Sequence, residues 1–539
     1  MAADEELALK EKRAQSKENA FLVSFEDDDP ERPINWKRRK KVWVTLICSL
    51  ITFVVSFNSS IFSSDIVALS EYFDISQEVI ILGITVYVLG FAFGPVLFGP
   101  LSELYGRNLG MLPAFLVFIL FNLCTGLGQN VQTIIIGRFF SGLFGAAPLA
   151  VVAGNLADIW PTRQRGVAIA VYTAAVYMGP LLGPIVGGFT VASSLGFRWT
   201  AWFVIMFAGA VFLVAVFTLP ETHAPTLLKR KAKQLRKDTK VDKYHTAEEA
   251  KTVSIMDIIR SRLVMPIVLL ATELPLMLMT IYLSFVYGIT YLILVAYPVE
   301  FEENRGYPLG VGDLPFLGVA VGIIIGLIIA VADTPRFIRK LEISKGKPIP
   351  KERLPTMMIG GILLVIGLFW FGWTSYPHAS WIPPTLAGMA IGSGLFLIFL
   401  QALNYITDTY TRVAASAVAG NAFVRAMLAA GFPLFGGQMF RNLGVDWASS
   451  TLGFISLVLV PIPFVFYFFD EWVRGKSRYA KEDGKLMCTP SQLKEKQNNE
   501  VESPLDRRRG CRSSAQTNEA EVWHERNMRK LSRYLSDSE

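Results

Sequence analysis

Two arginines that lie within long uncharged stretches are the first candidates for chemistry in this sequence. Arg138 follows 30 uncharged residues and precedes 19, whereas Arg425 lies between uncharged stretches of 12 and 15 residues. An arginine at the centre of a bilayer costs about 2.5–3.5 kcal/mol on translocon-derived scales, so such a side chain is expected to face a cavity or a partner. We predict that Arg425 faces an internal cavity. Arg138 either does the same or snorkels from the membrane boundary to the headgroups.

A glycine- and proline-rich run between the two arginines predicts an unusual helix. The run contains Gly179, Pro180, Gly183, Pro184, Gly187 and Gly188. Three of the glycines are spaced four residues apart, so they line one helix face and permit close approach of another backbone. Each proline removes a backbone donor and bends the helix. We expect this helix to form a seam about which parts of the protein rock, with simple helix packing as the alternative.

A third group of residues indicates a gating loop. It consists of Gly99, Glu103, Gly106, Arg107 and Asp158. The glycines permit a tight turn, and Arg107 is expected to reach Asp158. Such an ion pair would form in one conformational state and break in another. Without that partner, a loop carrying Glu103 and Arg107 would be ordinary solvated surface.

The elements that must position these residues are membrane-spanning helices. Of the 539 residues, 52% are hydrophobic and only 18% are charged, whereas soluble proteins carry about 25% charged residues. Uncharged runs such as residues 166–197 exceed the roughly 20 residues that a spanning helix needs. We predict twelve spans, at residues 42–64, 79–101, 109–128, 131–156, 167–191, 199–219, 275–299, 314–333, 355–375, 383–406, 413–436 and 447–469.

The predicted spans divide evenly about a polar middle loop. The expected parts are an N-terminal tail, a first six-helix bundle, a middle loop, a second six-helix bundle and a disordered C-terminal tail, at residues 1–41, 42–219, 220–262, 263–469 and 470–539. A faint repeat supports this division, because Asp158 and Arg163 after the fourth span resemble Asp408 and Arg412 after the tenth. No polar segment has both the length and the apolar content of a nucleotide-binding domain, and a P-loop is missing, so an ATP-driven pump is disfavoured.

The distribution of lysine and arginine predicts the orientation. With the N-terminus inside, only Arg198, Arg305 and Arg441 of the 52 basic residues lie in outer loops, so both termini and the middle loop are expected to be cytoplasmic. The basic residues 37–41 abut the first span, where they can meet anionic headgroups. They indicate topology rather than nucleic-acid binding, and the expected partner is the lipid bilayer.

These motifs together resemble the major facilitator superfamily, specifically the fungal twelve-span drug:proton antiporters. Residues 99–107 resemble its loop signature, residues 138–145 its arginine motif in the fourth span and residues 179–188 its antiporter motif. The similarity extends over residues 35 to 480. It implies an all-α membrane protein with two pseudo-symmetric six-helix bundles and proton coupling through Arg138. It also implies a monomer in the plasma membrane, or alternatively the vacuolar membrane, that needs a proton gradient and neither a metal nor a cofactor.

The sequence departs from the family pattern at three places. Glu103 stands where the family usually has aspartate, and Asn108 replaces a basic residue. Near the end of the first span, Asp65 is unusual for this branch and would tune the protein toward cationic substrates. An outer-edge carboxylate of this kind is otherwise simply solvated.

The resemblance implies export of amphiphilic xenobiotics or a fungal secondary metabolite by alternating access, and no enzymatic activity. The candidate cavity residues are Tyr172, Tyr177, Tyr282, Tyr287, Tyr291, Gln401, Asn404, Asn421 and Arg425. Aromatic walls with few polar anchors suit varied apolar ligands, although tyrosines near helix ends are also typical of the interfacial belt. No acid lies at mid-depth of a predicted span, so the protonated group is not identified. A polyamine or other organic-cation exporter and a non-transporting sensor remain alternatives.

Overall fold

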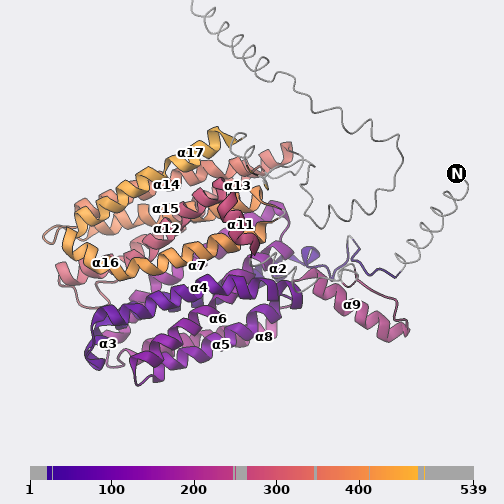
Figure 1. The fold of residues 1–539 in the computed structure, drawn as a ribbon, viewed down its shortest axis with the longest axis horizontal. Coiled ribbons are helices and arrows are strands. Elements are labelled where there is room, and N and C mark those ends of the chain that lie inside the picture. The colour runs from indigo at the N-terminus through magenta and orange to yellow at the C-terminus, as the bar shows by residue number, and fades with distance from the viewer. Residues whose placement is uncertain are drawn as a thin grey trace, which may run out of the picture. The chain divides into compact units, whose positions relative to one another are not determined.

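The computed structural model describes residues 21–246, 249, 264–344, 349–470, 477 and 479, apart from 27 and 412. Most of the predicted C-terminal tail and part of the middle loop therefore lie outside the described residues. In the described part, long helices run side by side along one direction (Figure 1). Extended structure there is confined to a bridge between Leu22 and His245. The expectation of an all-α membrane fold is confirmed.

The N-terminal bundle contains the first six spans. Its helices are α2 (Arg38–Ile61), α3 (Ile66–Phe73), α4 (Gln77–Tyr105), α5 (Arg107–Leu127), α6 (Val131–Ile159), α7 (Thr162–Ala192) and α8 (Arg198–Thr218). A 3-10 turn, η2 (Phe62–Asp65), joins α2 to α3, so the first span is a 36-residue helical stretch. Within this bundle α2 packs on α7, α4 on α6 and α5 on α8.

The C-terminal bundle contains the remaining spans. Its elements are α11 (Met265–Thr272), α12 (Leu274–Tyr297), the π-helical turn η4 (Pro298–Asn304), α13 (Phe316–Ile343), the 3-10 turn η5 (Pro350–Arg353), α14 (Leu354–Thr374), α15 (Ile382–Thr409), α16 (Ala414–Leu459) and α17 (Pro461–Phe468). In the described residues, eleven helical stretches are long and apolar enough to cross a membrane. The last, Ala414–Phe468, contains two predicted spans, because Gly444 with φ 78° and ψ 158° turns the chain between them.

The helices extend beyond the predicted spans where polar residues continue them. The eighth span was predicted to end at residue 333, but α13 continues to Ile343. Ion pairs support this extension, since Arg336 lies 2.5 Å from Asp333 and both Arg336 and Lys340 contact Glu352 at 3.0 and 2.8 Å. Hydropathy marks only the apolar part of such a helix.

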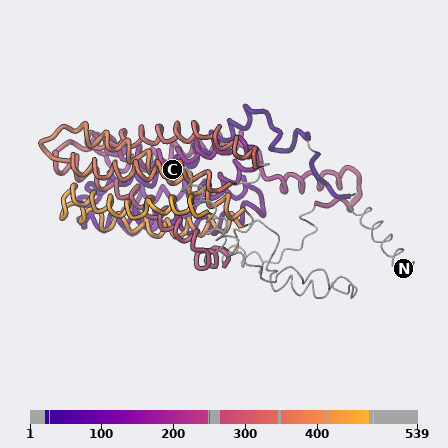
Figure 2. The backbone as a smooth tube through the Cα atoms, turned by 90° about the horizontal axis from the view of Figure 1, so that it is seen from above, coloured from indigo at the N-terminus to yellow at the C-terminus, as the bar shows by residue number. Residues whose placement is uncertain are grey.

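The two ends of the bundle differ. The basic helix α9 (Ala224–Thr239) lies beyond one end, together with the described N-terminal segment (Figures 1 and 2). We call this the α9 end and the opposite one the far end. Between these ends the two bundles meet mainly where α4 packs on α16 and α7 on α13.

Candidate functional site

Arg138 on α6 is anchored inside the N-terminal bundle. Its side chain is 1% exposed, and it donates hydrogen bonds to the carbonyl oxygens of Asn58 at 2.8 Å, Ser59 at 3.2 Å and Gly83 at 3.2 Å. Its guanidinium also lies 4.3 Å from the ring centroid of Tyr87. The last carbonyls of a helix lack intrahelical partners, and Arg138 satisfies two of these at the end of α2. The alternative in which Arg138 snorkels to the headgroups is therefore wrong.

A chain of polar groups leads from Arg138 into the opposite bundle. The Tyr291 hydroxyl on α12 donates to Ser59 Oγ on α2 at 3.4 Å, and it lies 3.3 Å from the Tyr287 hydroxyl. The guanidinium of Arg425 on α16 lies 4.9 Å from the Tyr287 ring centroid. The two arginines that the sequence singles out therefore lie at the two ends of one buried polar path.

Aromatic rings fill the interface beside this path. Tyr177 of α7 meets Phe399 of α15 edge to face, with ring centroids 5.0 Å apart. Tyr287 stacks on Phe399 at 6.2 Å, and Arg425 lies 4.6 Å from the Phe399 centroid. The sequence prediction missed Phe399, because a phenylalanine in an apolar helix gives no sign of whether it faces lipid or the interior.

The predicted cavity residues are buried, apart from Arg425, which is half-buried. The five tyrosines and Gln401, Asn404 and Asn421 are buried, so the interfacial-belt alternative does not hold for the tyrosines. Tyr172 donates its hydroxyl to the Leu149 carbonyl at 3.1 Å. Gln401 Oε1 is buried without a hydrogen-bond partner in the described structure.

Two of the predicted cavity residues, Tyr282 and Asn421, make contacts inside the C-terminal bundle. A Cβ built on Gly361 of α14 would lie 3.0 Å from the Tyr282 hydroxyl, so Tyr282 points toward α14. Asn421 donates through Nδ2 to Thr280 Oγ1 at 3.1 Å. The second contact makes Asn421 a link between α16 and α12.

The glycine run packs α7 tightly against α2. A Cβ on Gly183 would lie 2.1 Å from Ser60 Oγ, and the glycines four residues before and after it approach atoms of residues 56–64 at 2.6 and 2.7 Å. The helix continues without interruption through Pro180 and Pro184. Since α2 and α7 belong to one bundle, this glycine stripe packs two helices of that bundle together, and a rocking seam along its length stays a prediction.

Only the last glycine of the run meets the opposite half. A Cβ on Gly188 would lie 2.2 Å from Asp313 Oδ2 and 2.7 Å from the Gly310 nitrogen, in the segment between η4 and α13. Asp313 is 3% exposed, and its Oδ2 has no hydrogen-bond partner in the described structure. Burial raises the pKa of Asp313 to about 8, with a further contribution from the charge of Glu302. The two halves are thus in tight contact at the far end.

Equivalent ion pairs lie at the α9 end of each bundle. Arg107 Nε is 3.0 Å from Asp158 Oδ2, and Arg353 Nε is 3.0 Å from Asp408 Oδ2. Each arginine lies at the start of the third span of its bundle, and each aspartate lies at the end of the fourth span. The contact predicted between Arg107 and Asp158 is present. Of the faint sequence repeat, Asp158 and Asp408 take equivalent places in the two bundles, whereas Arg412 lies outside the described residues.

Glu221 contacts the loop that the sequence predicts to act as a gate, a contact that the sequence prediction missed. It accepts hydrogen bonds from the main-chain N–H of Arg107 at 2.9 Å and from that of the next residue at 3.2 Å. A carboxylate at a helix N-terminus accepts hydrogen bonds from main-chain N–H groups that have no partner within the helix, and its negative charge interacts favourably with the helix dipole. Gly106 has φ 106°, and a Cβ there would lie 2.7 Å from Glu221. Glu103 is half-buried, and the position of Gly99 opens onto free space.

Asp65 is buried, contrary to the expectation of a solvated carboxylate at the outer mouth. It is 1% exposed, and it accepts a hydrogen bond from Thr200 Oγ1 of α8 at 2.8 Å. Its Oδ1 has no hydrogen-bond partner in the part of the chain that the structure describes. Asp65 therefore faces the interior of the N-terminal bundle.

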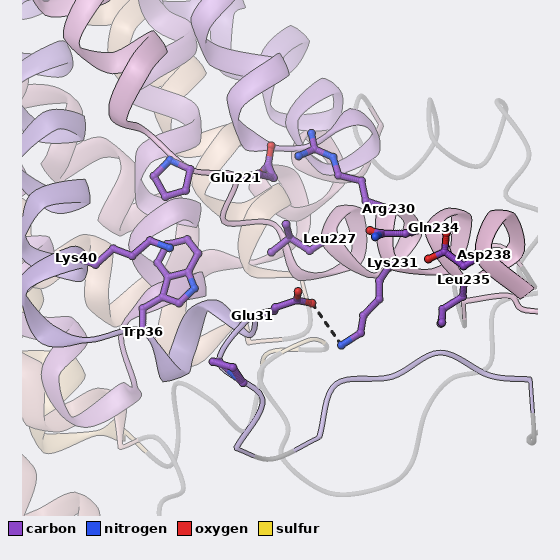
Figure 3. Close-up of a pocket in the computed structure, with 12 residues that line it drawn as sticks. Glu31, Trp36, Lys40, Glu221, Leu227, Arg230, Lys231, Gln234, Leu235 and Asp238 are labelled. Carbon is purple, nitrogen blue, oxygen red and sulfur yellow. Dashed lines mark ion pairs between the residues drawn. The ribbon is translucent and has the colours of Figure 1, made fainter.

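A pocket of about 660 Å³ lies at the α9 end (Figure 3). Lys231 donates to Asp29 at 2.8 Å and lies 3.4 Å from Glu31, the ion pair that Figure 3 marks. The hydrogen bond between Lys231 and Asp29 lowers the pKa of Asp29 and raises that of Lys231. All of the lining residues lie outside the predicted spans, so this pocket is separate from the path between the bundles.

Comparison with known proteins assigns the family. A family model described as the Major Facilitator Superfamily matches residues 48–432. The chain belongs to this superfamily. A citrinin biosynthesis cluster transporter of the superfamily from Monascus ruber is 44% identical over 463 residues, covering 85% of this chain and 92% of the relative. An ascochitine biosynthesis cluster transporter from Didymella fabae is 43% identical over 85% of this chain and 89% of its own.

Solved structures support the same fold. The proton:xylose symporter XylE bound to a deoxyglucose derivative covers 80% of this chain and 97% of its own, with a TM-score of 0.58 and 17% identity. The human organic anion transporter MFSD10 covers 80% of this chain and 99% of its own, with a TM-score of 0.53 and 16% identity. At such low identity these similarities establish the superfamily fold alone. The chain is therefore a multi-pass membrane protein of a transporter superfamily.

Proposed function

We propose that the protein is a proton-coupled exporter of amphiphilic compounds, either xenobiotics or a fungal secondary metabolite. It works in the plasma membrane by alternating access, with α9 and both termini in the cytoplasm. The relatives named for biosynthetic clusters support a secondary metabolite as the substrate. The concentration of lysine and arginine at the α9 end supports the orientation.

The observation that carries this proposal is the buried interface of polar and aromatic groups between the bundles. Tyr177, Tyr287 and Phe399 offer ring faces, while Tyr291 and Arg425 offer hydrogen-bond donors. Transporters of two repeated bundles bind substrate near the bilayer midplane between the repeats. An aromatic wall with few polar groups favours amphiphilic ligands.

Alternating access requires contacts that break at each end in turn. At the far end, Gly188 packs against Gly310 and Asp313 of the other half. At the α9 end, Arg163 of α7 forms an exposed ion pair with Glu342 of α13, which also joins the halves. In this proposal, breaking the far-end contact opens the substrate path to the outside, and breaking the Arg163–Glu342 ion pair opens it to the cytoplasm.

Proton coupling through Arg138 follows from its partners in this proposal. Its hydrogen bonds fix the end of α2, and Ser59 at that end contacts Tyr291 of the other half. A change in protonation that weakens the hold of Arg138 on α2 would therefore alter the contact between the bundles. The buried Asp65 belongs to the same bundle, and its carboxylate, when ionised, interacts electrostatically with Arg138.

The proposal is tested by the accumulation of radiolabelled amphiphilic compounds in cells with and without the gene. Cells that carry the gene should accumulate less of a transported compound. A protonophore that collapses the proton gradient should remove the difference. Equal accumulation in both cell lines for a broad set of compounds, with the protein present in the plasma membrane, would contradict export.

A further inference from the structure

Arg425 is a cation at the interface with free hydrogen-bonding capacity. It lies on α16, is half-buried, and donates through Nη1 to Asn421 Oδ1 at 3.3 Å. Its Nε is buried without a hydrogen-bond partner, and Arg425 forms no ion pair with any residue in the described ranges. A cation within a membrane span that has no counter-ion is costly. Its presence therefore calls for an anionic partner that arrives during the working cycle.

The surroundings of Arg425 favour an anion over a cation. The guanidinium lies over the rings of Tyr287 and Phe399, with distances of 4.9 and 4.6 Å to their centroids. The acidic residues of α4 and α15 in the described structure lie at helix ends, as Glu103 and Asp408 do. Asp446 of α16 follows the turn at Gly444, and none of these acids forms an ion pair with Arg425 in the described ranges. Asp65 is bonded to Thr200 inside the other bundle. The interface is thus positively charged at mid-depth.

We propose that Arg425 is the anion-binding residue of the transport path and that the substrate is an aromatic acid. The substrate's carboxylate, or an acidic phenolate or enolate, binds the guanidinium, and its ring packs against Tyr287, Phe399 and Tyr177. This assignment rests on the proposed function and names the substrate class of that site.

The geometry of a stacked arginine fits this role. A guanidinium lying over an aromatic face keeps its N–H donors at the edge of the plane, where they match the two oxygens of a carboxylate. Tyr177 extends the same surface, since its ring meets Phe399 at 5.0 Å and its buried hydroxyl has no partner in the described structure. An aromatic acid can therefore satisfy the unpaired Nε of Arg425 and the hydroxyl of Tyr177 while it buries its ring.

The test compares three probes that share one ring system: 1-naphthoate, 1-naphthalenemethanol and 1-naphthylmethylammonium. Binding to the full-length protein in lipid nanodiscs is measured by equilibrium dialysis at pH 7.5, with empty nanodiscs subtracted. The variants are Arg425→Gln, Arg425→Lys and the control Arg441→Gln. Arg441 lies on the same helix but pairs with Glu303 at the far end, so the control removes one positive charge away from the interface.

We expect the wild-type protein and Arg441→Gln to bind naphthoate about tenfold more tightly than the alcohol, because hydrogen bonds between two charged groups are about twice as strong as neutral ones. Arg425→Gln should bind both probes equally, and Arg425→Lys should keep part of the preference. An unchanged preference in Arg425→Gln, or tightest binding of the ammonium probe by the wild type, would overturn the assignment.

Two further outcomes are also decisive. If Arg425→Gln loses binding of the alcohol as well, the Arg425→Lys variant becomes the deciding measurement. A preference for naphthoate that persists in Arg425→Lys supports the assignment, and the loss of that preference contradicts it. Binding in nanodiscs requires no proton gradient. A preference for naphthoate in a protein that never moves protons would therefore refute the proposed function while leaving the anion site in place.

Discussion

The replacement of Gly183 by valine tests how closely α7 and α2 are packed. A Cβ at this position would lie 2.1 Å from Ser60 Oγ, 2.8 Å from the Ile61 nitrogen and 3.0 Å from the Phe57 carbonyl oxygen. Ordinary contacts between such atoms are about 3.5 Å, so the first overlap exceeds 1 Å and two of the three atoms belong to backbone that cannot rotate away. The helices must separate, which costs about 1–3 kcal/mol for an overpacked core.

A matched control is available in the same bundle. Gly209 of α8 has no atom within 4 Å of a built Cβ, and a valine there relieves the penalty of a helical glycine, a gain of a few tenths of a kcal/mol. Melting of the two variants in detergent, followed by size-exclusion chromatography, should therefore give a lower Tm for Gly183→Val and an unchanged or higher Tm for Gly209→Val. Gly183→Val should also lose efflux although it reaches the membrane. Equal melting temperatures and normal efflux would refute the packing argument.

Substitutions at three further places probe the remaining contacts. Arg138→Ala should uncouple transport from pH, because it releases the end of α2, whereas Arg138→Lys should keep part of the coupling; a pH profile of efflux that the alanine variant leaves unchanged would speak against this. Removing either partner of the Arg107–Asp158 pair should slow transport, and the double swap should restore part of the rate, since the pair is partly buried at 3.0 Å and the loss of one partner leaves the other charge uncompensated. Because burial raises the pKa of Asp313 to about 8, its packed state binds a proton that an exposed carboxylate, with a pKa of about 3.9, has already lost. The equilibrium constant for packing of residues 305–316 should therefore fall about tenfold for each unit rise in pH between about 4 and 8. Hydrogen exchange of these residues, corrected for the intrinsic exchange rates, measures this dependence, and Asp313→Asn should abolish it.

Much of the fold follows from the sequence because a bilayer imposes simple rules. Each predicted span lies on a helix, since about 20 apolar residues without charges have few other stable arrangements in lipid. The ends were less predictable, as the continuation of α13 to Ile343 illustrates. The ion pairs Arg336–Asp333 and Arg336–Glu352 that extend this helix depend on tertiary contacts that hydropathy does not contain.

The candidate site was predictable only in part. The unusual cost of a buried arginine singles out Arg138 and Arg425 without a structure, and both lie on the polar path. Their partners were not predictable, since Arg138 binds backbone carbonyls at the end of α2 and every residue has a carbonyl. The burial of Asp65 also depends on a distant residue, Thr200, which nothing in the local sequence indicates.

The most direct test of proton-driven export uses the purified protein in liposomes that contain a pH-sensitive dye. With an imposed pH gradient, addition of a transported aromatic acid should accelerate proton movement across the membrane, and the compound should accumulate against its own gradient. Liposomes with Gly183→Val should respond like empty ones. A wild-type protein that moves the compound at the same rate with and without the pH gradient, and never against its concentration gradient, would contradict the account.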